Sequence, residues 1–133
     1  MTAPPLMTSA CHCTGCQRMS SSAYSLSAAF PASNFAVIRG TPVLGGLRKG
    51  THHLFCPSCK SWMFTRPEGM DEFVNVRTPM LDDTSGLEPF VETYMREKLP
   101  WITPTASRTY ETFPEMEAYP SLLAAYAAYR ASK

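Results

Sequence analysis

The sequence has no long run of like charge and no long run of apolar residues. Arg48-Lys49 is its longest basic run, and the formal net charge is only +1, with acids and bases mixed along the chain. This distribution lacks the electrostatic footprint of a protein that binds nucleic acid or an anionic membrane surface. The longest apolar runs are also far too short to span a bilayer. We therefore expect neither a nucleic-acid partner nor a membrane partner.

Residues 1–10 contain neither a basic segment nor a sustained apolar one, so no secretory signal is expected. We therefore expect a cytoplasmic location, where paired cysteines more often bind metal or do redox work than form structural disulfides. An odd count of five cysteines also fits a disulfide framework poorly. No glycine-rich phosphate loop, Gly-x-Ser-x-Gly elbow or paired-carboxylate pattern stands out, so sites of those kinds are not expected.

Residues that interrupt regular structure are frequent. Twelve prolines and seven glycines are spread along the 133 residues without a repeat, and the apolar stretches between them are short. This pattern indicates short strands and many turns. Alternating or apolar stretches predict strands at residues 24–30, 35–39, 42–44, 52–55, 61–65, 72–77 and 89–94.

Only the C-terminal region has helical periodicity. Residues 121–131 are rich in alanine, with Leu122, Tyr126 and Tyr129 at positions i, i+4 and i+7. A helix laid against the sheet is the simplest interpretation, and a partner-binding helix is the alternative. We predict a mainly β fold with this C-terminal helix, organised as a loose arm at 1–10 and a single zinc-binding β domain at 11–133.

All five cysteines lie in two clusters, Cys-His-Cys-Thr-Gly-Cys at residues 11–16 and Cys-Pro-Ser-Cys at residues 56–59. Cysteines that served only as small apolar filler would be scattered along strands and helices. Turn-forming residues between the thiols let several sulfurs converge on one point, as a zinc ion requires. The sequence therefore predicts a zinc site.

Cys11, Cys13 and Cys16 form a Cys-x-Cys-x-x-Cys run. Three protein ligands are typical of a catalytic zinc site, whose fourth position is left to water or substrate. The same three thiols also suit a structural site that is completed by a thiol of the second cluster or by a histidine. His12 is a poor ligand, because its side chain would tend to point away from a metal held by its neighbours.

Cys56 and Cys59 have the spacing of a zinc knuckle at the tip of a hairpin. The alternative is a redox pair, which would need to lie between a strand and a helix, whereas both flanks predict strands. Five thiols permit one four-sulfur site with a spare cysteine, or a three-sulfur site and a two-sulfur site. The second arrangement would have to recruit His52, His53, water or a carboxylate.

On these residues, the sequence resembles the glutathione-dependent formaldehyde-activating enzyme family, which has a centromere-protein branch. Four segments carry the resemblance: Cys-His-Cys-Thr-Gly-Cys-Gln-Arg at 11–18 with the residues up to Tyr24, Phe-Cys-Pro-Ser-Cys at 55–59, the turn that ends Leu-Asp-Asp at 81–83, and Lys-Leu-Pro-Trp at 98–101. The resemblance implies a β-tent, a folded antiparallel sheet arrangement with zinc knuckles. Ser21 and Lys60 stand where the family usually has glycine.

The resemblance also implies two zinc sites. Cys11, Cys13 and Cys16 would surround a catalytic zinc, while Cys56 and Cys59 would hold a structural zinc together with a Cys-x-Cys hairpin that precedes the first cluster in the family. The ten residues before Cys11 contain no cysteine, so that hairpin is missing here. We therefore hypothesise that Cys56 and Cys59 either join the first cluster around one zinc or have lost the metal.

The implied activity is that of a zinc-dependent carbon–sulfur lyase, which adds the thiol of glutathione to formaldehyde or a related aldehyde. Arg18, Arg48 and Lys49 are candidates to meet the carboxylates of glutathione, on the basis of their charge alone. The alternative is a non-catalytic zinc module that carries glutathione or binds a protein partner. A saturated four-sulfur site would favour the module, because such a metal cannot take a substrate.

Overall fold

The structure is a computed structural model that describes residues 1–47 and 50–133. In this part of the chain, one eight-stranded sheet has the order β3-β4-β5-β6-β2-β1-β7-β8, and helix α2 follows it. The strands are β1 (Met7–Cys11), β2 (Ser25–Pro31), β3 (Val43–Gly45), β4 (Thr51–Phe55), β5 (Trp62–Pro67), β6 (Phe73–Arg77), β7 (Val91–Thr93) and β8 (Arg108–Thr109). The helical segments are α1 (Thr14–Ser20), α2 (Tyr119–Ala131), η1 (Ala32–Asn34), η2 (Thr78–Met80), η3 (Met95–Glu97) and η4 (Met116–Ala118). The mainly β class with a C-terminal helix is confirmed.

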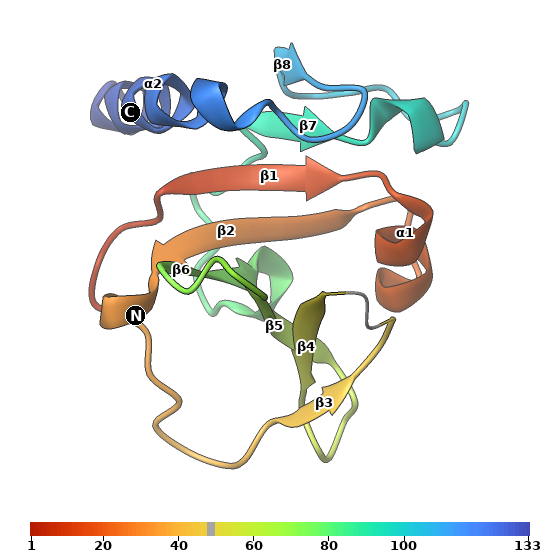
Figure 1. Ribbon diagram of the computed structural model, residues 1–133, viewed down its shortest axis with the longest axis vertical. Coiled ribbons are helices and arrows are strands. Elements are labelled where there is room, and N and C mark those ends of the chain that lie inside the picture. The colour runs from red at the N-terminus through yellow and green to blue at the C-terminus, as the bar shows by residue number, and fades with distance from the viewer. Residues whose placement is uncertain (48–49) are drawn as a thin grey trace.

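The sheet is mixed rather than wholly antiparallel. Neighbouring strands from β3 to β1 are antiparallel, whereas β1 pairs with β7 and β7 with β8 in parallel. Residues 78–90 and 94–107 form the connections that lead into β7 and β8, and connections of this length let a strand return in the same direction. Figure 1 shows β3, β4 and β5 steeply inclined to β1 and β2, with β7, β8 and α2 together at the other end of the molecule.

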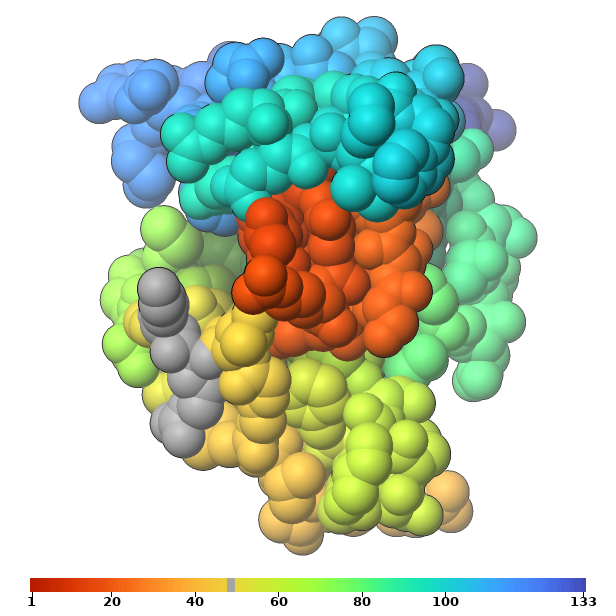
Figure 2. All heavy atoms as spheres, turned by 90° about the vertical axis from the view of Figure 1, so that its right-hand side faces the viewer, coloured from red at the N-terminus to blue at the C-terminus, as the bar shows by residue number. Residues whose placement is uncertain are grey.

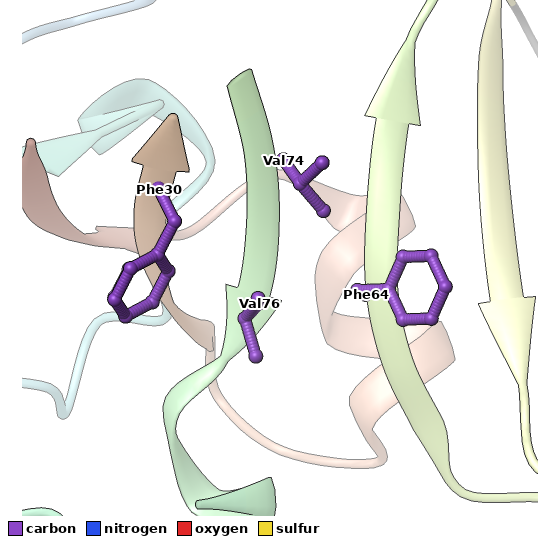
Figure 3. Packing of buried hydrophobic residues seen from close by; sticks show 5 residues of the cluster. Phe30, Phe64, Val74 and Val76 are labelled. Carbon is purple, nitrogen blue, oxygen red and sulfur yellow. The ribbon is translucent and has the colours of Figure 1, made fainter. Parts of the chain in front are cut away.

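The main apolar core lies on one face of β2, β5 and β6. It consists of Ala28, Phe30, Phe64, Val74 and Val76, and all five are buried. Residues two apart on a strand share a face, so the valines of β6 both face this core. Figure 3 shows these side chains on three adjacent strands.

A second apolar cluster holds α2 against the sheet. Leu122 and Tyr126 of the helix are buried together with Val91 of β7 and with Phe90, the residue before that strand. This agrees with the simpler interpretation of the alanine-rich segment, although α2 begins at Tyr119, two residues before the predicted range. Within residues 1–47 and 50–133, no helix combines the length and the apolar character needed to cross a membrane.

Residues 7–10, which the sequence assigned to a loose N-terminal arm, instead belong to a strand. These residues form most of β1, which lies between β2 and β7, and Thr8 and Ala10 are 0% and 1% exposed. The side chains of Thr8, Ser9 and Ala10 are small and lack hydrophobic alternation, so they gave no strand signal. The strand forms because both of its neighbours supply hydrogen-bonding partners.

Residues 35–39 do not form the predicted strand. The chain leaves η1 without a partner strand, and Ile38 is 97% exposed. Phe35 alone turns inward, with its ring centre 4.8 Å from that of Phe64. The apolar composition of this segment therefore does not make a strand. Each of the other six predicted stretches contains most of a strand.

Candidate metal centre

Three thiols converge where β1 meets α1. Cys11 is the last residue of β1, Cys13 is the N-cap of α1, and Cys16 lies in the first turn of that helix. Their sulfur atoms all lie within 4.8 Å of one another, and no other set of three or more ligand-type side chains in the described residues does so. In Figure 2 this segment, in red, reaches the surface between the cyan residues above it and the yellow residues below it.

Side-chain hydrogen bonds, several of them to Glu97, hold the start of α1. The sulfur of Cys13 accepts a hydrogen bond from the backbone N–H of Cys16 at 3.3 Å, in the manner of an N-cap oxygen. Glu97 accepts hydrogen bonds from the N–H and the hydroxyl of Thr14 at 2.6 and 2.8 Å. Gln17 donates to the carbonyl oxygen of Glu97 at 3.0 Å. The thiols of Cys13 and Cys16 are therefore held in place by Glu97, which is 83 residues from Thr14 in the sequence.

The three thiols share negative charge unequally. Hydrogen bonds from Cys11 and Cys16 to the sulfur of Cys13, with help from nearby backbone N–H groups, lower the pKa of Cys13 to about 2. The hydrogen bond with Cys13 raises the pKa of Cys11, and hydrogen bonds with Cys11 and then Cys13 raise the pKa of Cys16. One thiolate therefore forms readily, whereas ionising all three thiols needs a cation beside them. Such a donor set fits a zinc ion.

His12 does not belong to the group of three thiols. Its side chain is fully buried, and its Nε2 lies 2.6 Å from a carboxylate oxygen of Glu92. The other oxygen of Glu92 accepts backbone hydrogen bonds from Thr105 and Ala106 at 2.6 and 2.8 Å. Burial raises the pKa of the Glu92 carboxyl, but the N–H groups and His12 outweigh burial, so the pKa is lowered overall. This buried carboxylate therefore fixes the residue between the first two thiols.

Two further residues near the cluster, Ser25 and Arg77, were not identified from the sequence, whereas His53 had been considered for the second cluster. The hydroxyl of Ser25 hydrogen-bonds the thiol of Cys16, and the buried guanidinium of Arg77 donates to the same hydroxyl at 3.1 Å. His53 hydrogen-bonds the hydroxyl of Thr65 at 3.0 Å, and its pKa is lowered by burial and by Arg77. The available signal for Arg77 was a charged residue at the end of an alternating strand.

A family model of the glutathione-dependent formaldehyde-activating enzymes matches residues 1–97, which contain both cysteine clusters and every strand except β8. The chain belongs to the glutathione-dependent formaldehyde-activating enzyme family. A search of curated proteins finds no match. Family membership supports a formaldehyde-activating function that involves glutathione, and the cluster of Cys11, Cys13 and Cys16 is compatible with zinc.

Cys56 and Cys59 do not join this cluster. They lie in the predicted hairpin turn between β4 and β5, and neither belongs to the group of three thiols. Cys59 is exposed, and hydrogen bonds with Ser61 and Cys56 lower its pKa to about 7. Strands flank the pair on both sides, which is not the setting of a thioredoxin-type motif. In the described residues the two clusters therefore do not form one group of sulfur atoms, and the hypothesis that Cys56 and Cys59 share a zinc with the first cluster or have lost the metal stays a prediction.

The predicted glutathione-binding cations are only partly described. Arg18 is exposed on the last turn of α1, two residues beyond Cys16. Arg48 and Lys49 lie outside the described residues. His52, which was considered for the second cluster, instead lies with its Nε2 3.2 Å from a carboxylate oxygen of Glu68.

Ser21 and Lys60 both have positive backbone φ angles, of 50° and 62°. Ser21 is the C-cap of α1, and Lys60 directly follows the second cysteine pair. A residue with a Cβ atom pays roughly 1–2 kcal/mol for this left-handed conformation, whereas glycine does not. Glycine, which the family resemblance implies at these two positions, would adopt this conformation without that cost.

Ser21→Gly and Lys60→Gly are each expected to raise the free energy of unfolding by about 0.5–1 kcal/mol. The gain is smaller than the strain released, because glycine also has more freedom in the unfolded chain. Denaturant unfolding at a fixed zinc concentration measures it, with alanine at the same positions as the control that should give no gain. Destabilisation by both glycine variants would contradict the left-handed assignment.

Proposed function

We propose that this chain is a zinc-dependent carbon–sulfur lyase that adds the thiol of glutathione to formaldehyde or a related aldehyde. The observation that carries the proposal is the convergence of three thiols within 4.8 Å, inside the segment that matches the family. Cys11, Cys13 and Cys16 would hold the zinc ion, since three protein ligands leave one position free. Bound zinc would supply the positive charge that keeps an incoming thiol deprotonated near neutral pH.

The nucleophile in this proposal belongs to the substrate. The sulfur of glutathione attacks the carbonyl carbon of formaldehyde, a carbon–sulfur bond forms, and the carbonyl π electrons move to oxygen, which takes up a proton. The product is S-hydroxymethylglutathione. Arg18, Arg48 and Lys49 would bind the carboxylates of glutathione, on the basis of their charge.

The chain's own residues position the centre. The buried contact between His12 and Glu92 supports the peptide between the first two thiols, and Glu97 fixes the first turn of α1. Positioning of this kind matters because small displacements of a reacting group cost large factors in rate. A saturated four-sulfur site would favour the non-catalytic module, whereas the described residues bring three sulfurs together, which supports the enzyme.

The zinc-loaded protein is expected to accelerate the exchange between glutathione, formaldehyde and S-hydroxymethylglutathione above its spontaneous rate. Exchange spectroscopy by NMR at equilibrium measures both directions of the reaction in one sample. The controls are heat-denatured protein and an equal concentration of free zinc. Glutathione binding without any increase in the exchange rate would contradict the enzyme and support the carrier module.

A further inference from the structure

Arg77 is a buried cation without an acidic partner in the described part of the chain. It ends β6, is 8% exposed, and donates from Nη1 to the hydroxyl of Ser25 at 3.1 Å. Its buried Nε has no hydrogen-bond partner, and the ion pairs found within residues 1–47 and 50–133 involve other cations. A buried guanidinium in such a setting is strongly unfavourable unless negative charge lies nearby.

The nearby negative charge is that of the cysteine cluster. Burial lowers the pKa of Arg77 to about 10, while negative charge on Cys16 and Cys11, once metal binding has ionised these thiols, acts in the opposite direction. Ser25 links the two groups, because its hydroxyl contacts both the guanidinium and the thiol of Cys16. Ser25 is also the residue opposite Cys11 in the pairing of β1 with β2. Strands β2 and β6 therefore bring a positive charge to the thiols.

Aromatic contacts hold this charge in place. The guanidinium carbon of Arg77 lies 3.9 Å from the centre of the Trp62 ring, and Trp62 donates to Thr65 at 3.1 Å. The ring of Phe55 stacks on Trp62 with centres 6.3 Å apart. A charge that is already fixed needs no reorganisation when a ligand arrives. His53 adds no competing positive charge, because burial and Arg77 lower its pKa.

We propose that Arg77 is a positioning residue of the metal centre, whose fixed charge favours a negatively charged fourth ligand over a neutral one. The inference rests on the proposed function, because it takes the three thiolates to hold a divalent ion. Such a centre has one net negative charge, which the guanidinium balances. A thiolate as fourth ligand adds a second negative charge, and the buried cation offsets part of it at low effective dielectric. The substrate class selected in this way is a thiol that binds deprotonated.

The test uses the cobalt(II)-loaded protein, because cobalt reports its ligands through visible absorption. The probes are 2-mercaptoethanol, which binds as an anion, and imidazole, which binds uncharged. Arg77→Met is expected to weaken 2-mercaptoethanol binding about tenfold or more relative to imidazole, and Arg77→Lys to restore most of the difference. Arg108→Met is the matched control: this guanidinium lies 4.1 Å from the Phe90 ring, and its loss should leave both affinities unchanged.

Equal weakening of both probes, or no change in either, would overturn the inference. Arg77→Gln, which can still donate to Ser25, replaces the methionine variant if that variant does not fold. If neither neutral variant folds while Arg77→Lys does, the charge serves the fold rather than ligand choice, and the inference is also overturned. A wild-type protein that binds no cobalt at the three thiols would instead overturn the proposed metal centre, and the inference with it.

Discussion

Replacing Cys13 with serine is expected to remove zinc from the first cluster and to slow adduct formation by more than about 100-fold. Loss of even an outer-shell partner of a metal typically lowers metal affinity or activity about 10–100-fold. Cys13 would be a direct ligand, so its loss should have a larger effect. Serine keeps the hydrogen bond to the backbone N–H of Cys16, so α1 should still form. Zinc content by mass spectrometry and adduct exchange by NMR measure the two effects together.

Two controls separate metal loss from damage to the fold. Cys13→Ala removes the N-cap as well as the ligand, so it should be less stable than Cys13→Ser by about 1 kcal/mol while losing the same activity. Cys59→Ser removes a thiol that lies outside the group of three and should retain one zinc per chain and the wild-type rate. If a zinc-free Cys13→Ser protein catalysed adduct exchange at the wild-type rate, the proposed role of the metal would be refuted. If the wild-type protein held two tightly bound zinc ions, the hypothesis that Cys56 and Cys59 have lost their metal would be refuted.

Glu92→Ala is expected to lower the free energy of unfolding by about 3–5 kcal/mol, because it leaves buried partners unpaired. Those partners are His12 and the backbone N–H groups of Thr105 and Ala106. Zinc affinity should fall as well, since His12 lies between two of the thiols. Denaturant unfolding and a competitive zinc chelator measure the two changes. The matched control is Glu88→Ala, which removes an exposed contact with Lys133 of 2.7 Å and should cause no measurable change.

The same carboxylate predicts a pH dependence of stability. The pKa of Glu92 is lowered below its ordinary value of 4.5, so the folded protein binds its proton less tightly than the unfolded chain does. Its contribution is therefore fully present above about pH 4.5 and is lost as the pH falls through the lowered value. Unfolding of the metal-free protein between pH 6 and pH 3 should show this loss in the wild type and a shallower slope in Glu92→Ala. Identical slopes would show that Glu92 does not carry the effect.

The cysteine cluster was predictable because its geometry is local. A Cys-x-Cys-x-x-Cys run needs only a strand end and one helical turn to bring Cys11, Cys13 and Cys16 together, and the structure supplies both. The turn at residues 56–59 and helix α2 follow equally from nearby residues, through a proline-containing turn and a 3.6-residue period.

The assignment of residues 7–10 to β1 was not predictable in this way. A strand made mostly of small residues has little intrinsic signal, and its stability comes from the two strands on either side of it. The apolar stretch at 35–39 shows the converse, because apolar composition does not make a strand where no partner strand is available. Strand formation in both cases is set by the neighbours in the sheet rather than by the segment.

Short stretches of sequence determine the spacing of the thiols, the mainly β class and the C-terminal helix. They do so because turns and periodic faces depend on residues that are close to one another in the chain. The surroundings of the thiols depend instead on sheet order. Glu92 is 80 residues from His12, and Arg77 is 52 residues from Ser25, and these pairs meet because β7 lies beside β1 and β6 beside β2. The role of a charged residue in a strand cannot be inferred from the sequence until its spatial neighbours are known. Its contribution to stability depends on how deeply it is buried and on the opposite charge near it.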